Sequence, residues 1–246
     1  MSHIINDEAS KGGDYFMETL LVSLLPYIIG SAVVPLQIII GLLFLKSDKQ
    51  GLFKAVAYFT GMTLTRLLQG LIFGLILTEA AASAEASGDK NLVISTLLLI
   101  LGILLLIAAY KKWCGQDDPD EPPPKWLTTI DSSTPLKAFG IGVGLPLIAP
   151  KLWVFTLSAL ATIAAVQLGQ ASSAIVYLLF ILLAQSLLLL PILIRIFLPQ
   201  KSQSLLNQIS NWLTKNNRSI VIFVSLVFGL LFLKSGISGL LSITNK

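Results

Sequence analysis

Five polar side chains interrupt long apolar stretches of this sequence. Two are cations, Arg66 and Lys151, and three are amides, Gln37, Gln69 and Gln185. A charged side chain in a hydrocarbon environment is costly, and it usually marks a functional site. The thirteen Asp and Glu residues all fall in tails, loops or the edges of apolar stretches, so no carboxylate is expected to neutralise the two cations. We therefore expect Arg66 and Lys151 to meet an anionic group of a substrate, such as a carboxylate or a phosphate.

Three prolines lie inside apolar stretches near these side chains. Pro35 follows small residues in one stretch, and Pro146 and Pro150 fall in the middle of another. A proline removes a backbone donor and clashes with the preceding helical turn, so we predict a break or hinge at each of the three. The amino ends of the half-helices would add positive dipole near Arg66 and Lys151. In the alternative interpretation, the two cations bind backbone carbonyls that the prolines free, and only hold the broken helices.

The composition predicts an integral membrane protein. The 246 residues are 54% hydrophobic and 12% charged, with a mean hydropathy of +0.82, and such values are typical of membrane chains. There is one cysteine and one histidine, so we expect no metal site, no cofactor and no enzyme activity. The basic residues lie beside apolar stretches, which indicates membrane topology rather than nucleic-acid binding.

Six apolar stretches are each long enough to cross a bilayer. The predicted spans are 16–45, 53–77, 92–110, 138–166, 173–198 and 219–241. A polar tail, 1–15, precedes them, and a proline-rich acidic linker, 111–136, separates the third span from the fourth. Apolar residues recur at helical spacing within 202–214, which predicts an amphipathic helix at the membrane surface. The expected fold class is therefore an all-α integral membrane protein with six transmembrane helices.

Lysine and arginine residues gather on one side of these spans. The connections after the first, third and fifth spans contain ten of them, whereas the opposite side contains three. Positive residues concentrate in cytoplasmic loops. We therefore predict a multi-pass protein of the inner (cytoplasmic) membrane, with both termini outside the cytoplasm and the linker inside it.

Three spans on each side of the linker suggest an internal repeat. The two halves are 16–110 and 137–246. An odd number of crossings reverses direction, so the halves would be inverted relative to each other. Tyr58 precedes Arg66 by eight residues and Tyr177 precedes Gln185 by eight, so one alignment pairs both the tyrosines and the polar residues. We predict two inverted three-helix repeats, the first helix of each broken at proline, as in transporters with a site at the membrane midplane.

Residue counts place the two cations at a similar depth. Arg66 and Lys151 each lie thirteen residues from the inner end of their predicted span, roughly 20 Å at about 1.5 Å per residue. Both are therefore expected in one central layer. Hydroxyl residues that could line a path beside them are Ser31, Thr63, Thr65 and Ser186. Glycines expected to allow close helix packing in the last span are Gly229, Gly236 and Gly239.

Two long segments, 33–77 and 122–159, resemble the family of peptidoglycolipid- and sulfolipid-addressing (GAP) proteins, which belongs with the lysine-exporter (LysE) superfamily. The triplet Ala149, Pro150 and Lys151 is similar to the Asn-Pro-Lys signature of amino-acid exporters, but Ala149 replaces the Asn, which argues against an amino-acid substrate. The resemblance covers the chain from about residue 21. It implies a six-span exporter fold and the export of substrates that can be linked to lipid.

Together these features favour a secondary transporter that exports an anionic small molecule or lipid-linked precursor by alternating access. Its substrate would bind Arg66 and Lys151 together with Gln37, Gln69 and Gln185. The expected partners are membrane lipids and the anionic substrate, without nucleic acid, and a homodimer is left open. The alternative is an accessory membrane protein that assists the export of envelope lipids without transporting substrate itself.

Overall fold

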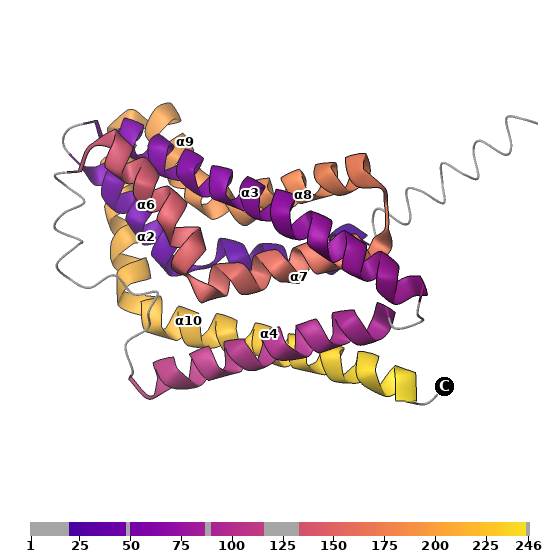
Figure 1. The fold of residues 1–246 in the computed structure, drawn as a ribbon. Helices are drawn as coiled ribbons and strands as arrows, with labels where there is room; N and C mark the ends of the chain where they lie inside the picture. The colour runs from indigo at the N-terminus through magenta and orange to yellow at the C-terminus, as the bar shows by residue number, and fades with distance from the viewer. Residues whose placement is uncertain (1–19, 48–49, 87–89, 116–132, 245–246) are drawn as a thin grey trace, which may run out of the picture.

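The computed structural model describes residues 20–47, 50–86, 90–115 and 133–244, which form helices and short turns without any strand. The predicted tail 1–15 and most of the linker 111–136 lie outside these residues. In chain order, the helices are Leu20–Ala32, α2 (Pro35–Lys46), α3 (Gly51–Ala86), α4 (Lys90–Trp113), α6 (Pro135–Ile148), α7 (Pro150–Val166), α8 (Gln170–Ala184), α9 (Ser186–Phe197) and α10 (Pro199–Thr244). Figure 1 shows most of them running roughly side by side in one bundle.

Three helices, α3, α4 and α10, are each long and apolar enough to cross a membrane. Three pairs of shorter helices meet at bends, of 53° between Leu20–Ala32 and α2, 70° between α6 and α7, and 61° between α8 and α9. The described helices thus provide three spans, or six if each bent pair crosses once. The outward side of α3 is apolar, with Leu71 63% exposed and Leu75 55% exposed, as expected for a helix that contacts lipid. These findings confirm an all-α membrane protein within the described residues.

The three bends occur at short interruptions in the helices. α2 begins at Pro35 and α7 begins at Pro150, a position where proline is favoured because the first helical N–H has no partner in the helix. The third bend lies at Gln185, between the end of α8 at Ala184 and the start of α9 at Ser186. This third bend was not predicted, because no proline or glycine marks it in the sequence.

The break predicted at Pro146 does not occur. Pro146 lies inside α6, which continues to Ile148. A proline inside a helix removes one backbone hydrogen bond but need not end the helix. The chain leaves the helix at Ala149, which has φ −86° and ψ 104°. Since a residue that precedes proline disfavours the helical conformation, Pro150 accounts for the position of this break.

α10 is one helix of 46 residues. The predicted amphipathic segment 202–214 and the predicted span 219–241 are therefore parts of one helix, not two elements. In Figure 1 the orange start of α10 runs across one end of the bundle, and its yellow part then runs beside α4. In the first part, Leu206 and Leu213 are buried while Trp212 is 59% exposed, so this part has the two faces of a surface helix.

Glycines let two pairs of helices approach closely. Between α4 and α10, a Cβ atom at Gly236 would lie 2.8 Å from backbone atoms of α4, and Gly229 faces Gly102. Between α3 and α6, Gly61 and Gly142 each face the backbone of the other helix. Small residues allow membrane helices to pack at short range. The packing role predicted for Gly229 and Gly236 is confirmed.

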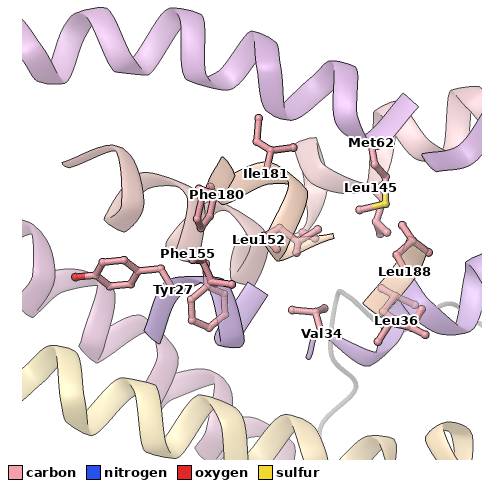
Figure 2. Packing of buried hydrophobic residues seen from close by; sticks show 14 of the residues in the cluster. Tyr27, Val34, Leu36, Met62, Leu145, Leu152, Phe155, Phe180, Ile181 and Leu188 are labelled. Atoms are coloured by element: carbon pink, nitrogen blue, oxygen red, sulfur yellow. The ribbon is translucent and has the colours of Figure 1, made fainter. Parts of the chain in front are cut away.

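The bent pairs surround an apolar core. It includes Val34 and Leu36 at the first bend and Leu152 and Phe155 of α7. Figure 2 shows these side chains together with core residues from α3, α6, α8 and α9. The ring of Phe155 packs edge-on against Phe228 of α10, with 5.5 Å between the ring centroids. The polar side chains described next are therefore embedded in apolar surroundings.

Candidate functional site

Three side chains of α3, spaced three residues apart, each contact one of the bends. Thr63 contacts the bend between α8 and α9, Arg66 contacts the bend before α2, and Gln69 contacts the end of α6. Residues three apart lie on adjacent turns along one side of a helix. One side of α3 therefore contacts all three bends.

At the first bend, a glutamine replaces the donor that proline lacks. In a continuous helix, the N–H of residue 35 would donate to the carbonyl oxygen of Ser31, but Pro35 has no N–H. The Nε2 group of Gln37 donates to that oxygen at 2.6 Å. Gln37 is fully buried, and an unpaired buried carbonyl would cost roughly 1–3 kcal/mol. Gln37 therefore stabilises the break rather than leaving its amide free for a ligand.

Arg66 is fully buried against the same bend. Its Nη1 group donates to the hydroxyl oxygen of Ser31 at 2.9 Å, and its Nη2 group donates to Oε1 of Gln37 at 3.5 Å. Its Nε group has no hydrogen-bond partner among the described residues. Among the described residues, the only acidic ones are Glu79 and Glu85, and both lie further along α3. Within these residues the guanidinium is held by neutral oxygens.

The second bend has an arrangement of the same kind. Pro150 has no N–H, so the carbonyl of Pro146 loses its helical donor. The Nε2 group of Gln69 donates to that oxygen at 3.2 Å, and Nε1 of Trp153 donates to the carbonyl of Leu147 at 2.9 Å. Side chains therefore do bind the carbonyls at the ends of the interrupted helices, as the alternative interpretation proposed. The donors seen at these carbonyls are Gln37, Gln69 and Trp153, whereas Arg66 donates to the side chains of Ser31 and Gln37.

At the third bend, Gln185 occupies the interruption itself. It is fully buried, and its Oε1 atom accepts a hydrogen bond from the hydroxyl of Thr63 at 3.1 Å. Its Nε2 group has no partner within the described part of the chain. The backbone carbonyl of Gln185 accepts from the N–H groups of Leu188 and Leu189, so α9 starts directly from this residue.

A pocket lies between the first bend, α4, α7 and α10. It is lined by residues 33–36, by Lys112 of α4, by Lys151 and Phe155 of α7, and by α10 residues between Asn217 and Ser225. Its cavity volume is about 20 Å³, room for about one water molecule, so the pocket is nearly closed in this conformation. Lys112 and Lys151 are each only 6% exposed. We call this the lysine pocket.

The lysine pocket combines positive charge with apolar walls. α2 begins in it, and the N-cap residue Val34 provides no side-chain hydrogen bond to the first turn of the helix. The amino end of a helix attracts anions, and Lys112 and Lys151 add two cationic side chains. Val221 and Val224 contribute an apolar wall. The lining therefore offers positive charge on one side of the pocket and apolar surface on the other.

The residues predicted from sequence fall into two groups. Gln37, Gln69 and Gln185 contact protein groups at the three bends, and Arg66 joins Gln37. Lys151 lines the lysine pocket, and Arg66 does not. The two cations therefore do not share one cavity in this conformation. The depth estimate counted residues along straight helices, whereas α6 and α7 meet at 70°.

From the sequence, Lys112 was expected only to mark the membrane topology. A signal for its burial was nevertheless present. Leu101, Leu105 and Ala109 are buried on one side of α4, and Lys112 follows Ala109 by three residues on the same side. A lysine that continues an apolar helix face at helical spacing is expected to point into the protein. No comparable sequence pattern predicted that Asn217 would line the same pocket.

The fold and the site define a multi-pass α-helical membrane protein with a cationic pocket among its helices. The chain belongs to the family described as Sap, sulfolipid-1-addressing protein, whose match covers residues 24–238. This confirms the resemblance to sulfolipid-addressing proteins noted in the sequence. No curated protein and no solved structure matches the chain.

Proposed function

We propose that this protein exports an anionic lipid or lipid-linked precursor across the cytoplasmic membrane. The observation that carries the proposal is the lysine pocket, where Lys112, Lys151 and the amino end of α2 lie beside apolar walls inside a membrane bundle. Lysine ammonium groups and the amino end of a helix both attract phosphate and carboxylate groups. An amphiphile with a small anionic headgroup supplies both the charge and the apolar surface. The name of the family, which refers to a sulfolipid, agrees with this choice.

We propose alternating access as the mechanism. Lys112 lies in the last turn of α4, at the end of the protein where the sequence places the cytoplasm, so the headgroup would enter the pocket from the cytoplasmic side. Changes at the three bends would then open the site outward. An inside-negative membrane potential assists the outward movement of an anion, which fits a site built from cations.

The proposed topology follows from the sequence. Each bent pair would cross the membrane once, which gives six spans in two inverted repeats of three, with both termini outside the cytoplasm. Transporters of this kind place discontinuous helices at the substrate site. Lys151 and the amino end of α2 would bind the headgroup directly. Gln37, Gln69, Gln185 and Arg66 would keep the bends in shape around it.

Reconstitution tests this proposal. The purified full-length protein is placed in liposomes that contain a trace of NBD-labelled phosphatidylglycerol or NBD-labelled phosphatidylcholine, and dithionite reports how fast the label crosses the bilayer. We expect saturable crossing of the anionic lipid, faster than in protein-free liposomes, and little crossing of the zwitterionic lipid. An accessory protein that transports nothing itself would give the protein-free rate for both lipids, and this result would contradict the proposal.

A further inference from the structure

The wall of the lysine pocket and the contacts of Arg66 belong to the same short segment. Residues 33–36 line the pocket, and the residues that bind Arg66, Ser31 and Gln37, lie on either side of that segment. Ser31 belongs to the helix Leu20–Ala32 and Gln37 belongs to α2. The guanidinium of Arg66 thus contacts both halves of the bent pair, and its own backbone is part of the straight helix α3.

We propose that Arg66 is a positioning residue that holds the first bend closed and thereby shapes the lysine pocket, without touching the substrate. We call the three residues Ser31, Gln37 and Arg66 the bend latch. A change in the angle between Leu20–Ala32 and α2 must move Ser31 relative to Gln37. It must therefore break or lengthen at least one hydrogen bond of the bend latch.

The side-chain chemistry suits a latch that can open. A guanidinium offers several N–H donors in one plane, so Arg66 can bind two acceptors on different helices at once. Both acceptors are neutral, and the contact with Gln37 is long at 3.5 Å. The buried Nε group has no partner in the described residues, so its N–H is left without an acceptor. An ion pair in the same place would be harder to open.

The coupling to the pocket follows from the chain connectivity. The amino end of α2 is one wall of the lysine pocket, and it starts two residues before Gln37. If the bend latch opens, this helix end moves away from Lys151 and the site for an anion is lost. An anion bound in the pocket would conversely favour the closed latch, because coupling between two sites is reciprocal. This consequence for ligand binding rests on the proposed function, whereas the latch itself does not.

Spin-label distances test the latch directly. The labels are placed at Val22 and Lys46, one on each half of the first bent pair, in a full-length Cys114→Ser background. A second pair of labels, at Leu136 and Val166, reports on α6 and α7. The key variant is Ser31→Ala, which removes one acceptor of Arg66 but keeps the backbone carbonyl that Gln37 binds. Ile29→Ala, at a 52% exposed position on the same helix, is the matched control. Ser31→Ala avoids the folding risk of Arg66→Met.

We expect Ser31→Ala to broaden or shift the Val22–Lys46 distance distribution in the absence of ligand, and to leave the Leu136–Val166 distribution unchanged. Ile29→Ala should change neither distribution. The affinity for NBD-phosphatidylglycerol should fall at least about fivefold in Ser31→Ala, in the range of typical coupling between sites. A wild-type Val22–Lys46 distribution in Ser31→Ala would overturn the latch, and so would equal changes in both label pairs, which would indicate general loosening.

The two proposals fail in different ways. If NBD-phosphatidylglycerol does not bind the wild-type protein but Ser31→Ala still changes the first bend alone, the latch is supported and the proposed function is wrong. If Lys151→Met abolishes lipid binding while Ser31→Ala changes neither the bend nor the affinity, the latch is wrong and the proposed function is supported.

Discussion

Gln69 donates a hydrogen bond from Nε2 to the carbonyl oxygen of Pro146 at 3.2 Å. This oxygen is the one that Pro150 leaves without a helical donor, since proline has no N–H. The same relationship occurs at the first bend, where Gln37 binds the carbonyl that Pro35 leaves open. Inside a membrane no water can satisfy such a group. Two glutamines therefore allow two helices to be interrupted within the apolar core.

Replacing Gln69 by leucine should destabilise the protein. Gln69→Leu keeps a similar volume but leaves the carbonyl of Pro146 unpaired, which costs roughly 1–3 kcal/mol. The free energy of unfolding in mixed detergent micelles measures the effect. The control is Gln208→Leu, at an exposed glutamine of α10, which should change the unfolding free energy by much less. Equal stability of Gln69→Leu and wild type would show that the carbonyl finds another partner.

Packing of α3 against α6 gives a second prediction, with controls on the same helix. A Cβ atom at Gly142 would lie 3.0 Å from the carbonyl carbon of Tyr58, whereas nothing lies within 4 Å of one at Gly140 or Gly144. Gly142→Ala should therefore destabilise the protein by about 1–3 kcal/mol through overpacking. Gly140→Ala and Gly144→Ala should be neutral, or stabilising by up to about 1 kcal/mol because alanine favours helix. Thermal unfolding of the three variants in detergent decides the matter; similar losses in all three would contradict the close contact.

Part of this architecture can be predicted from the sequence because it depends on local pattern. Apolar stretches of sufficient length predict membrane helices, and small residues such as Gly229 and Gly236 predict close packing, since a side chain there would meet the neighbouring backbone. Polar residues inside apolar stretches predict buried polar contacts, and Gln37 and Arg66 indeed contact each other. These inferences need no knowledge of how distant segments meet.

The rest depends on tertiary contacts that a single sequence does not encode locally. The bend at Gln185 is held by Thr63, which lies 122 residues away in the chain. Lys112 reaches the pocket of Lys151 because α4 packs along α10 and faces α7. Residue counts could not show this, since they describe depth along one helix and not the direction in which a bent helix turns.

The proposed orientation can be tested with the single native cysteine. Cys114 is exposed directly after α4, at the end of the protein proposed to face the cytoplasm. A membrane-impermeant maleimide should label it in inverted membrane vesicles but not in intact cells, where labelling should require permeabilisation. The control is Thr78→Cys in a Cys114→Ser background. Thr78 is exposed near the C-terminal end of α3, the end proposed to face outward. A cysteine there should be labelled more strongly in intact cells than Cys114 is. Labelling of Cys114 in intact cells would reverse the topology.

Transport of an anionic lipid by charge variants of the lysine pocket tests the central claim most directly. Lys151→Met and Lys112→Met remove one positive charge each and keep an unbranched side chain, and Lys234→Met does the same at an exposed position of α10. In liposomes, we expect the rate of NBD-phosphatidylglycerol crossing at low lipid concentration to fall at least about tenfold in each pocket variant, which corresponds to roughly 1.4 kcal/mol, and to stay at the wild-type level in Lys234→Met. Wild-type rates in both pocket variants would contradict the account.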